Sequence, residues 1–141
     1  MAINILVVDD APTMRKIIIK TINISGDYAG SIYEAGNGIE ALKVLEDKWV
    51  DLIITDINMP QMNGMELIKN LKSNPIFSRL PIIVVTSRGR KNLEQNEEWM
   101  LITEYLSKPF HPEQLRDIIF SIIGDEYAKE RDNEKSEEGD F

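Results

Sequence analysis

Short apolar runs alternate with amphipathic segments along most of the chain. The run Ile3–Val8 is apolar almost throughout, as expected for a strand that is buried on both faces of a sheet. Four further runs, one of them weaker, have the length and composition of strands. The predicted strands are Ile3–Val8, Ser31–Ala35, Asp51–Thr55, Leu80–Thr86 and Glu104–Ser107.

The segments between these strands carry apolar residues at helical spacing. In the first segment, Met14, Ile17, Ile18 and Ile22 follow the period of an α-helix. Helices are predicted over Thr13–Ile24, Gly38–Trp49, Gly64–Ser73 and Asn92–Met100, and a last one starts at Pro112. Alternating strands and helices predict an α/β fold, a doubly wound parallel sheet of five strands with five helices covering both faces.

Composition adds limits to this picture. A chain of 141 residues with 43% hydrophobic residues is one ordinary domain with a full core. There is no cysteine, which excludes disulfides, zinc-thiolate sites and thiol catalysis. The single histidine, His111, cannot build a multi-histidine metal site, so any metal would be bound by oxygen ligands.

Charge separates a domain from a tail. The net charge is −8, of which −5 falls on residues 125–141 and −3 on residues 1–124. We expect a folded domain over 1–124 and an acidic tail over 125–141 that extends the last helix by a turn or two and then frays. This acidic balance does not favour nucleic-acid binding.

The amino terminus, MAINILVVDD, is apolar over too short a run for a signal peptide, and no stretch approaches the ~18 apolar residues of a membrane span. We therefore expect a cytoplasmic protein without membrane insertion.

Polar side chains that can bind a ligand or react lie at the ends of the predicted strands. The carboxyl ends of parallel strands meet at one edge of a sheet, where ligands bind. The predicted strands end in Asp9-Asp10, Asp56, Thr86-Ser87 and Lys108, so three carboxylates, a hydroxyl and an ammonium group would converge at that edge.

Three carboxylates at one edge repel one another strongly, since each close pair costs several kcal/mol at an effective dielectric constant of ~20. A shared divalent cation relieves that repulsion, and oxygen ligands suit Mg²⁺, with Mn²⁺ as a second option. Asp56 follows an apolar strand and precedes a turn-rich loop. It is the best candidate for a carboxylate nucleophile that forms an acyl phosphate.

Several motifs resemble the receiver domains of two-component response regulators, in particular stand-alone chemotaxis-type regulators with a flavodoxin-like fold of strand order 2-1-3-4-5. The resemblance runs from Ile3 to Ile123. Its motifs are the Asp9-Asp10 pair, the segment DINMPQMNG that begins at Asp56, the Thr86-Ser87 pair and the segment Lys108-Pro109-Phe110. The spacing of all four motifs together makes the match very specific.

The resemblance implies a role for each matching residue. Asp56 would accept a phosphoryl group from a phosphohistidine on a sensor histidine kinase. Asp10, Asp56 and the backbone carbonyl of Asn58 would bind Mg²⁺ directly, and Asp9 would act through a bound water. Lys108 and Thr86 would contact the phosphoryl group, Tyr105 would turn inward as the switch, and the peptide bond before Pro109 would be cis. Output would pass through the fourth helix, fifth strand and fifth helix to a downstream protein, with the chain as a monomer or a phosphorylation-dependent dimer.

Some positions depart from the family pattern or stay open. Ser87 replaces the usual alanine, and Leu101-Ile102 stands where a glycine-containing pair is common. Tyr105 is either a switch residue or an ordinary core aromatic. The basic loop Arg88–Lys91 either meets acidic groups on a partner or is a solvated loop. Trp99 is either an exposed partner contact or a half-buried anchor.

A relay role, in which the phosphoryl group passes on to another protein, and two other classes of function are alternatives. An aspartyl-phosphate phosphatase of the haloacid-dehalogenase type requires D-x-D-x-[TV] after the first strand, and the sequence Asp9-Asp10-Ala11 does not supply it. A flavodoxin-like cofactor binder requires a hydroxyl- and glycine-rich loop at the same place, where this loop is acidic. A phosphorylated signalling switch, rather than an enzyme with an external substrate, is the prediction that fits.

Overall fold

The structure, a computed structural model, describes residues 2–124, and the predicted acidic tail over 125–141 lies outside the described residues. Five parallel strands form one sheet in the order β2-β1-β3-β4-β5. This is the predicted doubly wound, flavodoxin-like order. The strands are β1 (Ile3–Val8), β2 (Ala29–Ala35), β3 (Leu52–Thr55), β4 (Ile82–Thr86) and β5 (Glu104–Ser107).

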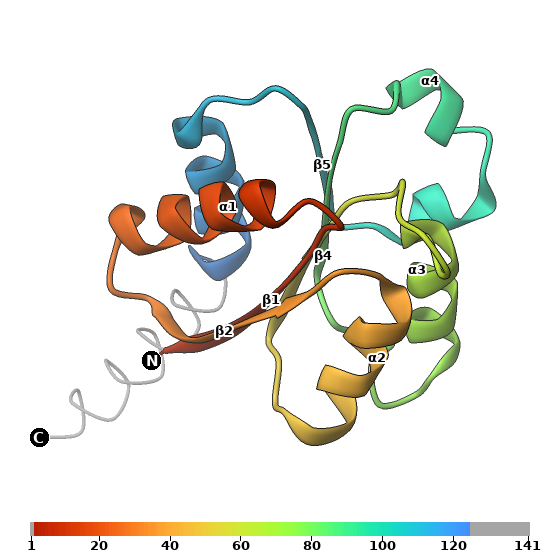
Figure 1. Cartoon of the computed structure of the whole chain (residues 1–141), viewed down its shortest axis with the longest axis horizontal. Helices are drawn as coiled ribbons and strands as arrows, with labels where there is room; N and C mark the ends of the chain where they lie inside the picture. The colour runs from red at the N-terminus through yellow and green to blue at the C-terminus, as the bar shows by residue number, and fades with distance from the viewer. Residues whose placement is uncertain (1, 125–141) are drawn as a thin grey trace, which may run out of the picture.

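Helices cover both faces of this sheet (Figure 1). One face is covered by α1 (Pro12–Ser25) and by a C-terminal helix that occupies residues 112–124 of the described chain. The other face is covered by α2 (Gly38–Asp47), α3 (Gly64–Ser73) and the short α4 (Arg90–Leu93). Within residues 2–124, no helix combines the length and the apolar character needed to cross a membrane.

The alternation of side chains along the strands divides the core in two. In β1, Leu6 and Val8 pack toward α2 and α3, while Ile5 and Val7 pack toward α1 and the C-terminal helix. All four side chains are buried. Because both faces of β1 meet helices, an apolar residue is needed at each of these four positions, which explains the continuous apolar run Ile5–Val8 in the sequence.

The backbone pairing brings the carboxyl ends of the central strands into line. The amide of Asp9 donates to the Ala35 carbonyl at 3.1 Å, and the amide of Asp56 donates to the Val8 carbonyl at 2.9 Å. At the far side, the amide of Lys108 donates to the Thr86 carbonyl at 2.9 Å. The residues that follow β1, β3 and β5 therefore start from fixed backbone positions at one edge.

The predicted bounds of β1, α3 and β5 agree with the structure residue for residue, and most others agree within one or two residues. One of the two-residue differences is the end of the second helix, which was predicted to reach Trp49. The helix ends at Asp47, and Trp49 is 76% exposed instead of buried. Its indole Nε1 donates to Asp51 Oδ1 at 2.9 Å, so the ring lies along the loop and not on the core.

The prediction of a continuous helix over Asn92–Met100 was wrong. The structure has one α-helical turn, Arg90–Leu93, followed by a 3₁₀ helix, η1 (Glu97–Leu101). Leu93 is the only fully buried side chain of the two helices. A helix without an apolar stripe gains little from packing, and such a segment does not sustain several α-helical turns.

Candidate functional site

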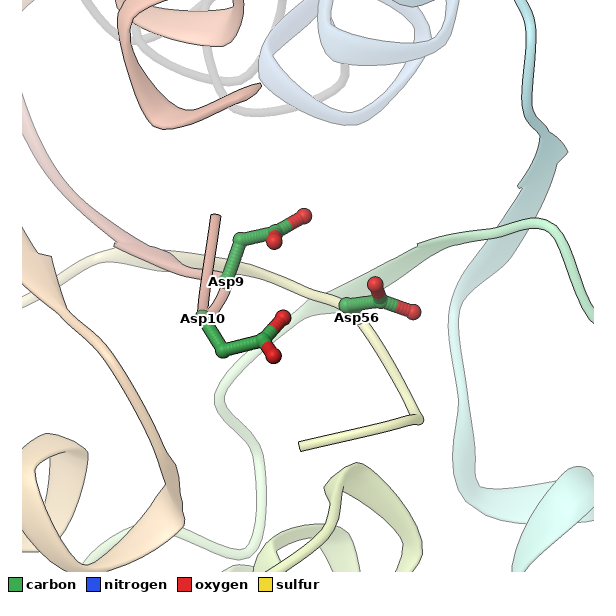
Figure 2. A group of neighbouring side chains, drawn as sticks. All are labelled: Asp9, Asp10 and Asp56. Carbon is green, nitrogen blue, oxygen red and sulfur yellow. The ribbon is translucent and has the colours of Figure 1, made fainter. Parts of the chain in front are cut away.

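Three carboxylates converge at the carboxyl edge of the sheet. Asp9 and Asp10 follow β1, and Asp56 follows β3, with their side chains directed to the same side (Figure 2). One oxygen from each carboxylate lies within 4.8 Å of the others. Asp9 and Asp56 are buried, with 1% and 8% exposure, whereas Asp10 is exposed. The sequence-predicted acidic trio is therefore one cluster in space.

Lys108 bridges two of these carboxylates. Its Nζ lies 2.7 Å from Asp9 Oδ2 and 2.8 Å from Asp56 Oδ2. Burial disfavours the charged amine, but the hydrogen bonds and the attraction of Asp56 and Asp9 outweigh burial and raise the pKa of Lys108 above its ordinary value. The amine is charged at neutral pH and offsets one of the three negative charges.

Backbone amides orient the same two buried carboxylates. The Ala11 amide donates to Asp9 Oδ1 at 2.9 Å, and the Ile57 amide donates to Asp56 Oδ1 at 2.6 Å. Each buried carboxylate thus has one oxygen on an amide and the other on Lys108. Among the described residues, no hydrogen bond or ion pair reaches the carboxylate of Asp10, whose place depends on its backbone alone.

The loop after Asp56 returns tightly to the site. The Gly64 amide donates to the Ile57 carbonyl at 2.9 Å, which closes the loop at the start of α3. A Cβ built on Gly64 would overlap the carbonyl oxygen of Asp56 and lie 2.9 Å from the Ile57 Cα. Asn63 caps α3 through a capping box with Glu66. Only glycine lets α3 start this close to Asp56.

Two hydroxyl residues lie at the carboxyl end of β4, where Thr86 is the last residue of the strand and Ser87 follows it. Thr86 is fully buried, and its Oγ1 accepts a hydrogen bond from the Arg88 amide at 3.3 Å. Ser87 is exposed at the same edge. Lys108 is joined to Thr86 through the backbone pairing of β4 with the residue after β5, so the hydroxyl and the amine belong to neighbouring strands.

Tyr105, on β5, is half-buried and contacts the loop after β4. Its hydroxyl donates to the Arg88 carbonyl at 2.9 Å, and its ring packs edge-on against Trp99 at a centroid distance of 5.4 Å. The guanidinium of Arg90 lies 5.7 Å from the Trp99 ring centroid. Trp99 is thus a half-buried anchor between the basic loop and β5, which answers the question its sequence position left open.

The last two predicted site residues lie at the rim. Asn58 is exposed two residues after Asp56, within the loop that leads to α3. The peptide bond between Lys108 and Pro109 is cis.

This donor set has the chemistry of a site for a hard divalent cation. Three carboxylate oxygens within 4.8 Å of one another are matched by only one ammonium group, so a net negative charge is left at the edge of the sheet. Oxygen ligands without nitrogen or sulfur suit Mg²⁺, which commonly takes one or two carboxylates and keeps waters or phosphate oxygens in its other positions. The residues present fit such an ion.

A known protein family matches most of this chain. The family model of the response regulator receiver domain matches residues 5–120 of the chain. The chain belongs to the response regulator receiver family. Receiver domains of this family are signalling switches, which agrees with the predicted class of function rather than with a phosphatase or a cofactor binder.

Chemotaxis proteins are among the similar relatives of this receiver domain. It is 37% identical over 121 residues to a chemotaxis protein CheY homolog of Campylobacter jejuni, covering 85% of this chain and 92% of the relative. Identity is also 37% to the chemotaxis protein CheY1 of Helicobacter pylori, covering 85% and 96% of the two chains. The predicted resemblance to chemotaxis-type regulators is confirmed.

Solved structures give the same fold. The chemotaxis response regulator CheY4 of Vibrio cholerae superposes with a TM-score of 0.76 at 29% identity, covering 86% of this chain and 99% of that one. The receiver domain of a Pseudomonas aeruginosa sensor histidine kinase gives a TM-score of 0.77 at 25% identity, covering 88% and 99%. That second structure has a magnesium ion coordinated in its active-site cleft.

The sequence analysis overlooked one residue of this receiver domain that contacts the site. Arg15, in the first turns of α1, donates from Nη1 to the Asp9 carbonyl at 2.6 Å and from Nε to Glu34 Oε1 at 3.0 Å. A basic residue shortly after an acidic pair was the only signal in the sequence. That signal is weak, because arginine is common on helix surfaces.

Proposed function

We propose that this receiver domain accepts a phosphoryl group on Asp56 from the phosphohistidine of a sensor histidine kinase and works as a signalling switch. The observation that carries the proposal is the convergence of three carboxylates with Lys108 at one sheet edge, in a chain of the receiver family. Asp9 and Asp56 both combine burial, an amide hydrogen bond and a contact with the amine. Asp56 is the proposed acceptor because it follows β3 directly and begins the segment DINMPQMNG, which resembles the family motif.

Mg²⁺ is the proposed cofactor, with Mn²⁺ as a substitute. The proposed ligands are the carboxylates of Asp10 and Asp56 and the backbone carbonyl of Asn58, with Asp9 acting through a bound water. When bound, the ion supplies positive charge that offsets the carboxylates and the oxygens of the incoming phosphoryl group. The magnesium in the related Pseudomonas receiver domain supports this choice.

In the proposed transfer, a carboxylate oxygen of Asp56 forms a bond to phosphorus while the bond from phosphorus to the donor imidazole nitrogen breaks. The imidazole leaves with the electron pair, and the product on Asp56 is an acyl phosphate. Lys108 stabilises the charge on the phosphoryl oxygens, because its amine is charged and already lies within 2.8 Å of Asp56. Thr86 and Ser87 are the proposed hydroxyl contacts of the transferred group.

The proposed output is a rearrangement at the α4–β5 side of the domain. The Thr86 hydroxyl would leave the Arg88 amide for the phosphoryl group, and Tyr105 would lose its contact with the Arg88 carbonyl and turn inward. We further propose that a downstream protein recognises this surface, that the chain acts in the cytoplasm, and that it is a monomer or dimerises on phosphorylation. Its catalysis is limited to its own phosphorylation and dephosphorylation.

The first experiment tests the acceptor. Wild-type protein incubated with a small acyl phosphate and Mg²⁺ should gain the mass of one phosphoryl group, and Asp56→Asn should not. Asp27→Asn, a matched change at an exposed acid, should behave as the wild type does. Chelation of Mg²⁺ should abolish the gain. An undiminished gain in Asp56→Asn would assign the acceptor to another residue.

The second experiment tests the coupling. In a Trp49→Phe background the remaining indole is Trp99, which contacts Tyr105. Titration with beryllofluoride and Mg²⁺, a stable mimic of the phosphoryl group, should change the fluorescence of Trp99. An unchanged spectrum at saturation would show that the α4–β5 side does not respond.

A further inference from the structure

We propose that Arg15 is a positioning residue for the metal site: its guanidinium holds the Asp9–Asp10 peptide and thereby fixes the carboxylate of Asp10. This inference rests on the proposed function, since it concerns the same Mg²⁺ site. It assigns a role to a side chain outside the acidic cluster and outside the motifs that identify the family in the sequence.

A positioning residue is needed because the three carboxylates are not held equally by hydrogen bonds. Asp9 and Asp56 are each oriented by a backbone amide and by Lys108. Asp10 is exposed, and no hydrogen bond from residues 2–124 reaches its carboxylate. A flexible ligand loses conformational freedom when it binds a metal, so its affinity depends on how well the backbone is held beforehand.

Arg15 supplies that hold at the peptide directly before Asp10. Its Nη1 donates to the Asp9 carbonyl at 2.6 Å, a short hydrogen bond from a charged donor. Rotation of this peptide plane would swing the Cα–Cβ direction of Asp10. The guanidinium therefore acts on the one carboxylate of the cluster that no hydrogen bond from residues 2–124 supports.

The guanidinium is itself fixed at its other side. Its Nε donates to Glu34 Oε1 on β2 at 3.0 Å, and the Arg15 side chain is only 18% exposed. The planar fork thus joins α1, β2 and the end of β1 in one arrangement. Lysine could replace the charge, but its ammonium is not a rigid planar group and could not hold the Asp9 carbonyl and the Glu34 carboxylate in the same arrangement.

A role through charge and a role through positioning predict opposite changes in Mg²⁺ affinity when Arg15 is removed, so an experiment can separate them. Arg15 brings a positive charge next to a cation site. If charge were its only effect, its removal would strengthen Mg²⁺ binding by reducing repulsion. If it positions Asp10, its removal would weaken Mg²⁺ binding despite that reduction.

The experiment measures the Mg²⁺ dissociation constant by titration calorimetry for the wild type, Arg15→Met and Arg15→Lys. Loss of an outer partner that orients a metal ligand commonly costs at least tenfold in metal affinity. We expect both variants to bind about tenfold more weakly. Arg116→Met, which removes an exposed charge paired with its neighbour Asp117, is the matched control and should bind as the wild type does.

A second measurement uses protein without metal. Amide hydrogen exchange at Asp10 and Ala11 should be faster in Arg15→Met than in the wild type, with the helix amides of the C-terminal helix unchanged as a check on the fold. Tighter or unchanged Mg²⁺ binding in Arg15→Met, or full affinity in Arg15→Lys, would overturn the positioning role. If the wild type itself bound no Mg²⁺ or took up no phosphoryl group, the proposed function would fail instead.

Discussion

Replacing Gly64 with alanine is expected to destabilise the fold and to disturb Asp56 at the same time. The added Cβ would overlap the Asp56 carbonyl oxygen and approach the Ile57 Cα at 2.9 Å. Both obstacles are backbone atoms, which cannot move aside as the end of a flexible side chain can. The start of α3 or the loop after Asp56 must shift to admit the methyl group.

The size of the effect follows from this geometry. Overpacking a close contact costs about 1–3 kcal/mol, and a collision with backbone belongs to the upper part of that range. At about 4 °C per kcal/mol for a domain of this size, the upper part of that range corresponds to a fall in Tm of roughly 8–12 °C. The shift also acts on the peptide whose Ile57 amide orients Asp56 Oδ1, so phosphoryl uptake should slow even where the variant is fully folded.

Gly89→Ala is the matched control. No atom lies within 4 Å of a Cβ built there, and its φ of −62° suits any residue. It should leave stability unchanged or raise it by about 0.4–1 kcal/mol. Thermal unfolding gives Tm, and time courses of intact mass with an acyl phosphate at 15 °C give the uptake rate. Equal Tm values and equal rates for the two variants would refute the proposed close contact between α3 and Asp56.

Two further predictions concern buried titratable groups. Lys108→Met removes the cation shared by Asp9 and Asp56, so calorimetry should show tighter Mg²⁺ binding. The rate of phosphoryl uptake at saturating Mg²⁺ should nevertheless fall at least about tenfold, because the amine is missing. Lys91→Met, at an exposed lysine, is the control, and a wild-type rate in Lys108→Met would contradict the assigned role. Burial raises the pKa of Tyr28 above its usual value, although a hydrogen bond to Ser25 opposes the rise. The neutral form is therefore favoured in the folded state, so its stabilisation is complete below about pH 10 and is lost as pH rises through the folded pKa. Urea unfolding between pH 8 and 11 should show a steeper alkaline loss for the wild type than for Tyr28→Phe, and parallel profiles would contradict this.

The sheet and its acidic edge could be predicted because local rules determine them. β1 is buried on both faces, so its apolar run marks a central strand, and Asp9 and Asp56 follow strands whose ends must meet in a parallel sheet. Asn63 and Gly64 start α3 through a capping box and a close backbone approach, both of which leave marks in the sequence. The convergence of the acids needed no knowledge of distant contacts.

The region after β4 could not be predicted in the same way. Arg90–Leu93 and Glu97–Leu101 form two short helices because only Leu93 is fully buried, and the rest of the arrangement depends on contacts between side chains far apart in the sequence. Trp99 packs on Tyr105, and Tyr105 reaches the Arg88 carbonyl 17 positions away. Periodicity reports the average face of a helix, and it cannot report where a weakly amphipathic segment breaks.

The proposed switch makes different demands on these two regions. The acidic edge must hold charged groups at fixed separations, and it is built on strand ends whose backbone pairs on both sides, as the bonds from Asp9 and Asp56 show. A surface that changes on phosphorylation must instead have two arrangements of similar free energy, and segments with few buried contacts are the ones that rearrange at low cost. Short helices joined through Arg90, Trp99 and Tyr105 meet that requirement. The part of the molecule that the sequence predicts least well is therefore the part where the proposed switch has most room to act.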